Sequence, residues 1–259
     1  KAGRTRQFNG CAPVGTLLGL SLLCAPTAQA DFVADSKGSL EARNFYFNRD
    51  FRQDGSRDKA EEWAQGFLLR MESGYTAGTF GFGLDVLGMA GFKLDSGGGT
   101  AGTNLLPPNG SGGSQDSYGE LGLTAKMRVS NSTLKFGTLQ IKDPVVSSND
   151  TRLLPSTFKG GLVNVQEIDR LKLTGGQLTQ INFVYSTDYQ DMTANRIGGQ
   201  SDRFQFAGAD YQFLPNLTAQ YRYGQLENIY QQNYLGLVHA RDLGAGQSLK
   251  SDVRYARST

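Results

Sequence analysis

The stretch "TAGTFGFGLDVLGMAGFKL", residues 76–94, decides the fold. From Phe80 to Leu94 every even position is apolar or glycine, whereas the odd positions include Asp85 and Lys93. Such alternation is typical of a β-strand with one apolar and one polar face. At roughly 3.3 Å per residue this strand would be about 45–50 Å long, far longer than most strands of soluble domains. Tilted by about 45°, it would still cross the apolar layer around an outer-membrane barrel.

Residues 120–129, "ELGLTAKMRV", repeat the pattern with apolar side chains at the odd positions. Turning Lys126 and Arg128 to lipid near mid-depth would cost about 2–4 kcal/mol each. We therefore expect both charges to face a wet interior. The same alternation, with charges on the face expected to be wet, occurs in residues 62–72, 217–227 and 248–256.

The connections between these expected strands alternate in length. Residues 130–133 and 213–216 fit tight turns, whereas residues 95–117, 140–161 and about 182–202 fit long loops. Short turns on one rim and long loops on the other are typical of outer-membrane barrels, and a soluble sandwich has no reason to keep that alternation. The sequence thus predicts an all-β chain forming a transmembrane antiparallel β-barrel, of which about eleven strands are covered here.

The start of the chain differs in composition from the rest. Three basic side chains precede an apolar run at residues 14–23, and Ala28-Gln29-Ala30 fits a cleavage site. We predict a secretory signal peptide over residues 1–30, since its apolar run is too short to span a membrane. Removing it changes the formal net charge from +2 to 2 − 3 = −1 and removes both cysteines. The rest of the chain then has no thiolate for a metal or for catalysis.

Two features do not fit a complete, regular barrel. Bacterial single-chain barrels have an even number of strands and pair the last with the first, and the last strand normally ends on an aromatic residue, unlike Ser258-Thr259. We therefore expect residues 31–259 to be the N-terminal portion of a single barrel, from a fragmentary record or a prematurely stopped product.

The first expected strand has no clear register. In "SLEARNFYFNRDF", residues 39–51, Phe45 and Phe47 share parity with Arg43 and Arg49. No single register keeps both arginines inside and both phenylalanines outside.

Four segments together resemble one family. Residues 144–161, "PVVSSNDTRLLPSTFKGG", resemble the inward-folded third loop of the OprD-type porins, the substrate-specific channels of Pseudomonas-like outer membranes. Residues 43–52, 72–95 and 226–237 also resemble that family, in its order. The resemblance implies a monomeric barrel of about eighteen strands in which a constriction loop, here at about 140–161, narrows a passage for small carboxylate-bearing nutrients.

The resemblance also implies a ladder of basic side chains that faces an acidic, carbonyl-rich side of the constriction. Guanidinium groups suit this role because they pair bidentately with carboxylates, and spaced cations replace lost hydration without one site holding the solute. By motif, the ladder includes Arg43, Arg49 and Arg152; by strand parity alone, it includes Lys126, Arg128, Arg222, Lys250 and Arg254. The constriction loop is expected to contribute Asp150, Thr151, Leu153, Leu154 and Pro155.

A second interpretation of these charges stays open. In this interpretation the basic side chains bind no solute; they pair with carboxylates on neighbouring strands and keep the interior wet. The carboxylates concerned are Glu41, Glu72, Glu120 and Asp252.

Other function classes receive less support. No segment is long and apolar enough to be a spanning helix after the leader. The one histidine, His239, has no recognisable Ser/His/Asp context, so we predict that the chain is not an enzyme; a barrel-type enzyme or a surface adhesin or lectin is the alternative. We predict no cofactor and no metal site, and the charge balance after leader removal does not support nucleic-acid binding.

The export signal and the barrel pattern place the chain in the outer membrane of a Gram-negative bacterium. Expected partners are small carboxylate solutes (aromatic or cyclic carboxylates, or amino acids), outer-membrane lipid and lipopolysaccharide, and the barrel assembly machinery. In the opening stretch, we expect Gly81, Gly83 and Gly91 to leave room for the constriction loop and Asp85 to be a wet channel-side carboxylate.

Overall fold

The structure is a computed structural model that describes residues 32–52, 58–96, 100–194, 198–244 and 246–259. The predicted signal peptide lies outside the described residues. Within these ranges, no helix has the length and apolar character needed to cross a membrane.

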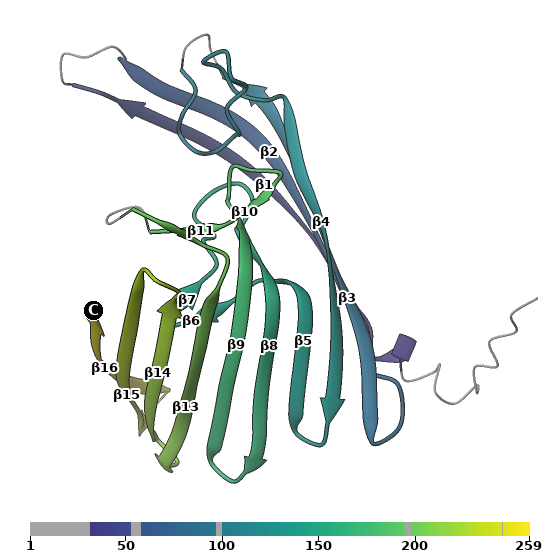
Figure 1. Cartoon of the computed structure of the whole chain (residues 1–259), viewed down its shortest axis with the longest axis vertical. Coiled ribbons are helices and arrows are strands. Elements are labelled where there is room, and N and C mark those ends of the chain that lie inside the picture. Colours follow the sequence, from purple (N-terminus) through teal and green to yellow (C-terminus); the bar gives the residue numbers. More distant parts are fainter. Residues whose placement is uncertain (1–31, 53–57, 97–99, 195–197, 245) are drawn as a thin grey trace, which may run out of the picture.

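One long curved antiparallel sheet dominates the chain, and eleven of its twelve strands form a continuous path in which neighbours in sequence are neighbours in space (Figure 1). The eleven strands along this path agree with the number of strands predicted from the sequence. The path runs through β1 (Lys37–Asp50), β2 (Lys59–Glu72), β3 (Phe80–Asp95), β4 (Ser117–Val129), β5 (Ser132–Leu139), β8 (Thr157–Ile168), β9 (Leu171–Asn182), β13 (Phe204–Leu214), β14 (Leu217–Leu226), β15 (Tyr230–Gly244) and β16 (Gln247–Ser258). The short β10 (Tyr189–Gln190) pairs with β9.

The connections separate into two rims, as the sequence predicts. Tight turns at residues 130–131, 169–170 and 215–216 lie at one end of the sheet, and the long loops lie at the other (Figure 1). Two loops carry small hairpins of their own: β6 (Lys142–Asp143) with β7 (Val146–Ser147), and β11 (Met192–Thr193) with β12 (Gln200–Ser201). The connection at 227–229 is an exception, because it is short although it lies on the long-loop rim.

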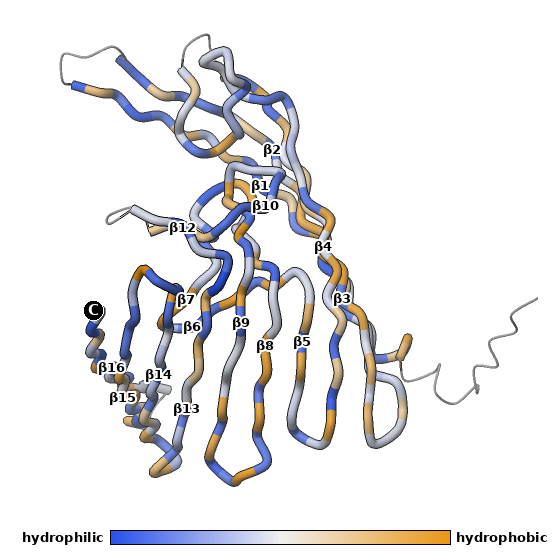
Figure 2. Tube along the Cα trace, viewed as in Figure 1, coloured by the Kyte–Doolittle hydropathy of each residue, from blue (hydrophilic) through white to orange (hydrophobic). Residues whose placement is uncertain are grey.

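The outer face of the sheet is apolar. Phe80 and Phe82 are 56% and 54% exposed, and Leu121 is 76% exposed. Because strand residues two apart share a face, apolar and polar residues alternate along the strands (Figure 2). A sheet that exposes so many large apolar side chains on one face suits lipid rather than water on that side. The predicted parity of residues 76–94 and 120–129 is confirmed.

The glycines of β3 face the interior, but their neighbours differ from those expected. A Cβ on Gly83 would lie 2.5 Å from Lys126 Cε and 2.7 Å from Gly74 O, and one on Gly91 would lie 2.3 Å from the ring of Tyr118. These glycines leave room for an inward-folded turn and for an interior tyrosine, so the expectation that they accommodate the constriction loop is wrong. The strand that does accommodate it is β2, where a Cβ on Gly66 would lie 2.9 Å from Leu153 Cγ.

The structure defines the register of the first strand. In β1 the odd residues Arg43, Phe45 and Phe47 are partly covered, whereas the even residues between them are exposed. Both phenylalanines therefore face the interior together with Arg43. They pack there against a buried cluster that includes Leu105 and Leu153, both 0% exposed. Sequence parity alone missed this arrangement because the apolar cover comes from two distant loops.

Candidate functional site

The loop between β5 and β8, residues 140–156, folds onto the interior face of the sheet. Its Leu153 and Leu154 are buried against Leu68 of β2 and Met89 of β3. We keep the name constriction loop for residues 140–156. The expected range is corrected at its end, because residues 157–161 belong to β8.

The other end of the constriction loop packs against a different part of the wall. Val145 is 8% exposed and belongs to a second buried cluster with Phe158, Phe204 and Leu226. A Cβ on Gly224 of β14 would lie 3.1 Å from the side chain of Val145. The loop therefore extends across the interior from β2 to β14, held at both ends by apolar packing.

Two ion pairs add to this attachment, and both use predicted ladder residues. Arg43 of β1 binds Asp150 at 2.6 Å, and Arg222 of β14 binds Asp143 at 2.7 Å. Arg43 also contacts Glu41 at 2.7 Å. Each arginine thus connects the barrel wall to a carboxylate of the constriction loop.

Arg222 is, with Lys126, one of the two most enclosed of the predicted ladder residues. Its side chain is 5% exposed, and its guanidinium donates to Asp143, to Asp210 and to the carbonyl oxygens of Ala209 and Tyr221. All of these contacts are at 3.1 Å or less. This guanidinium has its donors engaged by the protein itself, so it is a structural anchor in this geometry.

Arg152 has a different environment. It donates to the carbonyl oxygens of Thr103 (3.2 Å) and Thr151 (2.8 Å), and its guanidinium lies 5.1 Å from the ring centre of Phe47. Arg49 lies 5.7 Å from the same ring. Among the described carboxylates none forms an ion pair with either arginine. The two cations therefore lie near one aromatic ring with their charges uncompensated by an acid.

Lys126 and Asp85 form a buried pair on the interior face. Lys126 Nζ lies 2.5 Å from Asp85 Oδ1 and donates to Ser73 O at 2.6 Å. Lys135 reaches the other oxygen of Asp85 at 3.2 Å. The side chain of Asp85 is only 14% exposed, so it is a channel-side carboxylate, as expected, but an enclosed and paired one rather than a wet one.

The remaining predicted ladder residues are exposed. Arg128 lies 4.6 Å from the ring centre of Tyr75. Arg254 binds Asp252 within its own strand at 2.8 Å, and Lys250 is exposed on the same strand.

The eight basic residues therefore have different local partners. Arg49 and Arg152 lie near Phe47, and Lys126 and Arg128 lie near Tyr75. Arg43 pairs with Glu41 and Asp150, and the rest lie on β14 and β16. Arg43 pairs with Glu41 and Arg254 pairs with Asp252, but each pair lies within one strand, whereas the pairing interpretation expects carboxylates on neighbouring strands. Glu120, another carboxylate of that interpretation, accepts from the neutral donors Thr157, Asn182 and Tyr189. Whether these cations form a ladder for a solute stays a prediction.

The five residues predicted for the constriction loop differ in their exposure and contacts. Leu153 and Leu154 are buried at 0% and 3% exposure, so they support the loop and cannot face a solute. Asp150 is partly exposed beside Arg43, and Thr151 is held by Asn149 at 2.9 Å. Pro155 lines a cavity of about 270 Å³ next to the constriction loop.

Arg70 and Lys142 were not among the predicted site residues, although both line cavities beside the constriction loop. Arg70 lines the 270 Å³ cavity together with Lys142, and it also lines a second cavity of about 400 Å³ together with Lys135. The strand parity of Arg70 already indicated that it faces the interior. Lys142 had no such signal, because it lies in a two-residue strand inside a loop.

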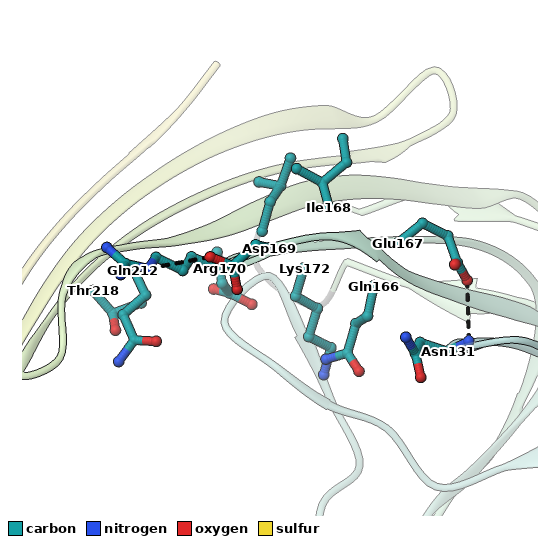
Figure 3. A pocket seen from close by; sticks show the side chains of 11 residues that line it. Asn131, Gln166, Glu167, Ile168, Asp169, Arg170, Lys172, Gln212 and Thr218 are labelled. Carbon is teal, nitrogen blue, oxygen red and sulfur yellow. Dashed lines mark hydrogen bonds and ion pairs between the residues drawn. The ribbon is translucent and has the colours of Figure 1, made fainter.

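A wider cavity of about 570 Å³ lies at the rim of tight turns (Figure 3). Its charges are largely satisfied locally: Glu167 accepts from Asn131 N at 3.1 Å and from Ser130 and Ser132, and Asp169 contacts Arg170 at 3.4 Å. The polar groups that line this cavity bind one another, and we assign the cavity no function.

An antiparallel sheet with an apolar outer face, a charged inner face and a loop folded across its interior defines the outer-membrane porins as a class. The family model described as "outer membrane porin, OprD family" matches residues 30–259, and this chain belongs to that family. The predicted family, fold class and outer-membrane location are confirmed. Membership of a porin family also confirms that the chain is not an enzyme.

Relatives and solved structures agree with this assignment. The chain is 46% identical over 215 residues to the porin-like protein GalP of Pseudomonas putida, covering 82% of this chain and 52% of GalP. It resembles Pseudomonas aeruginosa OccK9 (OpdG) with a TM-score of 0.84 and 43% identity, covering 88% of this chain and 59% of OccK9. The structure of Pseudomonas aeruginosa OpdK with vanillate gives a TM-score of 0.79 and 40% identity over 88% of this chain and 58% of OpdK. The chain spans about half the length of the curated relatives it matches.

Proposed function

We propose that the gene product carrying this chain is a diffusion channel for small carboxylate-bearing solutes. The observation that carries this proposal is the position of Arg70. Its side chain contributes to the lining of both the 270 Å³ cavity among the constriction-loop residues and the 400 Å³ cavity among the wall strands. A solute that moves from one cavity to the other passes this guanidinium.

The contacts of Arg70 leave it able to bind an anion. It holds Glu41 at 3.0 Å in a half-exposed pair, and its Nε lies 3.4 Å from Gln140 Oε1 of the constriction loop. Half-exposed pairs are weak, and a guanidinium has further N–H donors in a planar fork that matches a carboxylate. Arg70 differs in this respect from Arg222, whose donors are engaged by buried partners.

Further cations flank the same path. Lys142 lies in the lining of the 270 Å³ cavity, and Lys135 lies in that of the 400 Å³ cavity. Several moderate cationic sites in series let a carboxylate exchange lost hydration for protein contacts without being trapped. The related OpdK, whose structure contains vanillate, is consistent with a carboxylate as solute.

The test is the replacement Arg70→Gln. We expect benzoate flux into proteoliposomes to fall about tenfold, as the loss of one charge-assisted hydrogen bond of roughly 1.5 kcal/mol implies. Flux of benzyl alcohol, which is similar in size but neutral, should stay unchanged. Arg203→Gln is the matched control. Arg203 is an exposed arginine that pairs with Glu227 at 2.9 Å, and it lines neither of the two cavities. Equal benzoate flux in Arg70→Gln and the parent protein would refute the proposal.

Arg152→Ala gives an independent prediction. Its guanidinium is held by two carbonyl oxygens and the Phe47 ring rather than by an acid, so it is free to attract anions to the loop side. We expect a severalfold lower benzoate flux, most evident at low salt, where exposed charges act over a longer range. Circular dichroism should show an unchanged β-sheet signal. An unchanged flux at low ionic strength would exclude this role.

The other predicted partners stay part of this proposal. They are outer-membrane lipid and lipopolysaccharide around the apolar face, the barrel assembly machinery, and a monomeric state.

A further inference from the structure

A separate cavity of about 190 Å³ lies beside the constriction loop and shares no lining residue with the two cavities that Arg70 lines. Val146 of the loop contributes to one side, and Phe183, Met192, Phe204 and Tyr230 contribute to the others. No lysine, arginine, aspartate or glutamate is among the described residues that line it. We refer to it as the apolar cavity.

The size and lining of the apolar cavity suit a hydrocarbon ring. A cavity of about 150 Å³ lined by Leu, Ile and Phe side chains binds benzene. The apolar cavity is somewhat larger and is lined by similar side chains. The lining is mostly apolar, with Thr193 and Tyr230 as its polar side chains, and burying an apolar ring there releases roughly 25 cal/mol for each Å² removed from water.

The cavity also remains open to solutes. Phe204 and Met192 in its wall are buried at 3% and 6% exposure, whereas Val146, Ile181 and Tyr230 are only partly buried. Protein interiors are packed with few voids of this size. A partly open void with a buried wall, beside the loop that crosses the interior, therefore has the form of a binding site rather than of a packing defect.

We propose that the apolar cavity is a subsite that holds a six-membered hydrocarbon ring of a solute before it passes the constriction loop. The β6–β7 hairpin, which contributes Val146 to this subsite, also carries the cation Lys142. In the hairpin, Val146 pairs with Asp143 and Ser147 pairs with Lys142, and Lys142 lines two other cavities of about 270 and 300 Å³. The preference for a ring that also carries a carboxylate rests on the proposed function, whereas binding of the ring itself does not.

The test is Val146→Phe, which fills the cavity without removing packing from the loop. In proteoliposomes carrying the gene product, we expect the ratio of benzoate to acetate flux to fall about tenfold, since an immersed ring is worth roughly 1.5 kcal/mol or more. Val163→Phe is the matched control, because Val163 is a valine 38% exposed on the outer face of β8. Its flux ratio should equal that of the parent protein.

Two outcomes separate this inference from the proposed function. Benzyl alcohol has the ring but no carboxylate, so the ratio of its flux to that of methanol should also fall in Val146→Phe. If that ratio falls while Arg70→Gln leaves benzoate flux unchanged, the ring subsite stands and the carboxylate channel does not. If neither ring-bearing solute responds to Val146→Phe, or Val163→Phe has the same effect, the ring subsite is refuted.

Discussion

Replacing Arg222 with methionine should lower the free energy of unfolding by about 3–5 kcal/mol, because it leaves two enclosed carboxylates without their cation. The side chains of Asp143 and Asp210 are only 8% and 18% exposed, and Arg222 contacts each at 2.7 Å. After the replacement, Asp143 would retain one backbone donor, Val145 N at 3.1 Å, and Asp210 would retain Gln220 at 3.0 Å. Neither contact supplies a positive charge.

Urea titration in lipid vesicles, followed by circular dichroism, measures this loss. Arg254→Met is the matched control: Arg254 also holds an aspartate, but it is 66% exposed, and we expect no measurable change. Changing Asp143 and Asp210 to asparagine in the Arg222→Met protein should restore part of the stability, since the unpaired charges are then gone. Wild-type stability of Arg222→Met would show that this pair of contacts does not anchor the loop.

The strands and their faces could be predicted from the sequence because period-two alternation is a local property. The exposure of Phe80 and Phe82, and the tight turn at 130–131, follow from residues close together in the chain. Even the number of strands along the sheet followed from this local signal.

The partners of the interior charges could not be predicted in the same way. Arg43 and Asp150 are 107 positions apart, and Arg222 and Asp143 are 79 positions apart. The family motif assigns Arg43 to the interior and strand parity assigns Arg222 to it, but neither can say which carboxylate a folded loop brings to each arginine. The inward position of Phe45 has the same origin, since its cover comes from loops that local periodicity does not describe.

Within the opening stretch, we expect a large effect from Gly83→Val. The new Cβ would lie 2.7 Å from Gly74 O and 2.8 Å from Ser73 Oγ, closer than real Cβ atoms approach other atoms. Lys126 could move its flexible end away, but the backbone of the turn could not move without losing the hydrogen bond from Leu84 N to Ser73 Oγ (2.7 Å). We expect a loss of about 2–3 kcal/mol in the free energy of unfolding, as overpacking of an enclosed site typically causes.

Gly88→Val is the control, because it introduces the same side chain on the same strand but on the lipid-facing side. A Cβ on Gly88 meets only Leu69 Cβ at 3.7 Å, an ordinary contact on the lipid-facing side, so its effect should stay within about 0.5 kcal/mol. A second measurement is the reaction of Lys126 with an amine-specific reagent in the folded protein. Lys126 is 7% exposed because the turn at Ser73 and Tyr75 covers it, so Gly83→Val should raise its reactivity and Gly88→Val should not. Equal stability and equal Lys126 protection in both variants would mean that the turn does not occupy the space that Gly83 leaves.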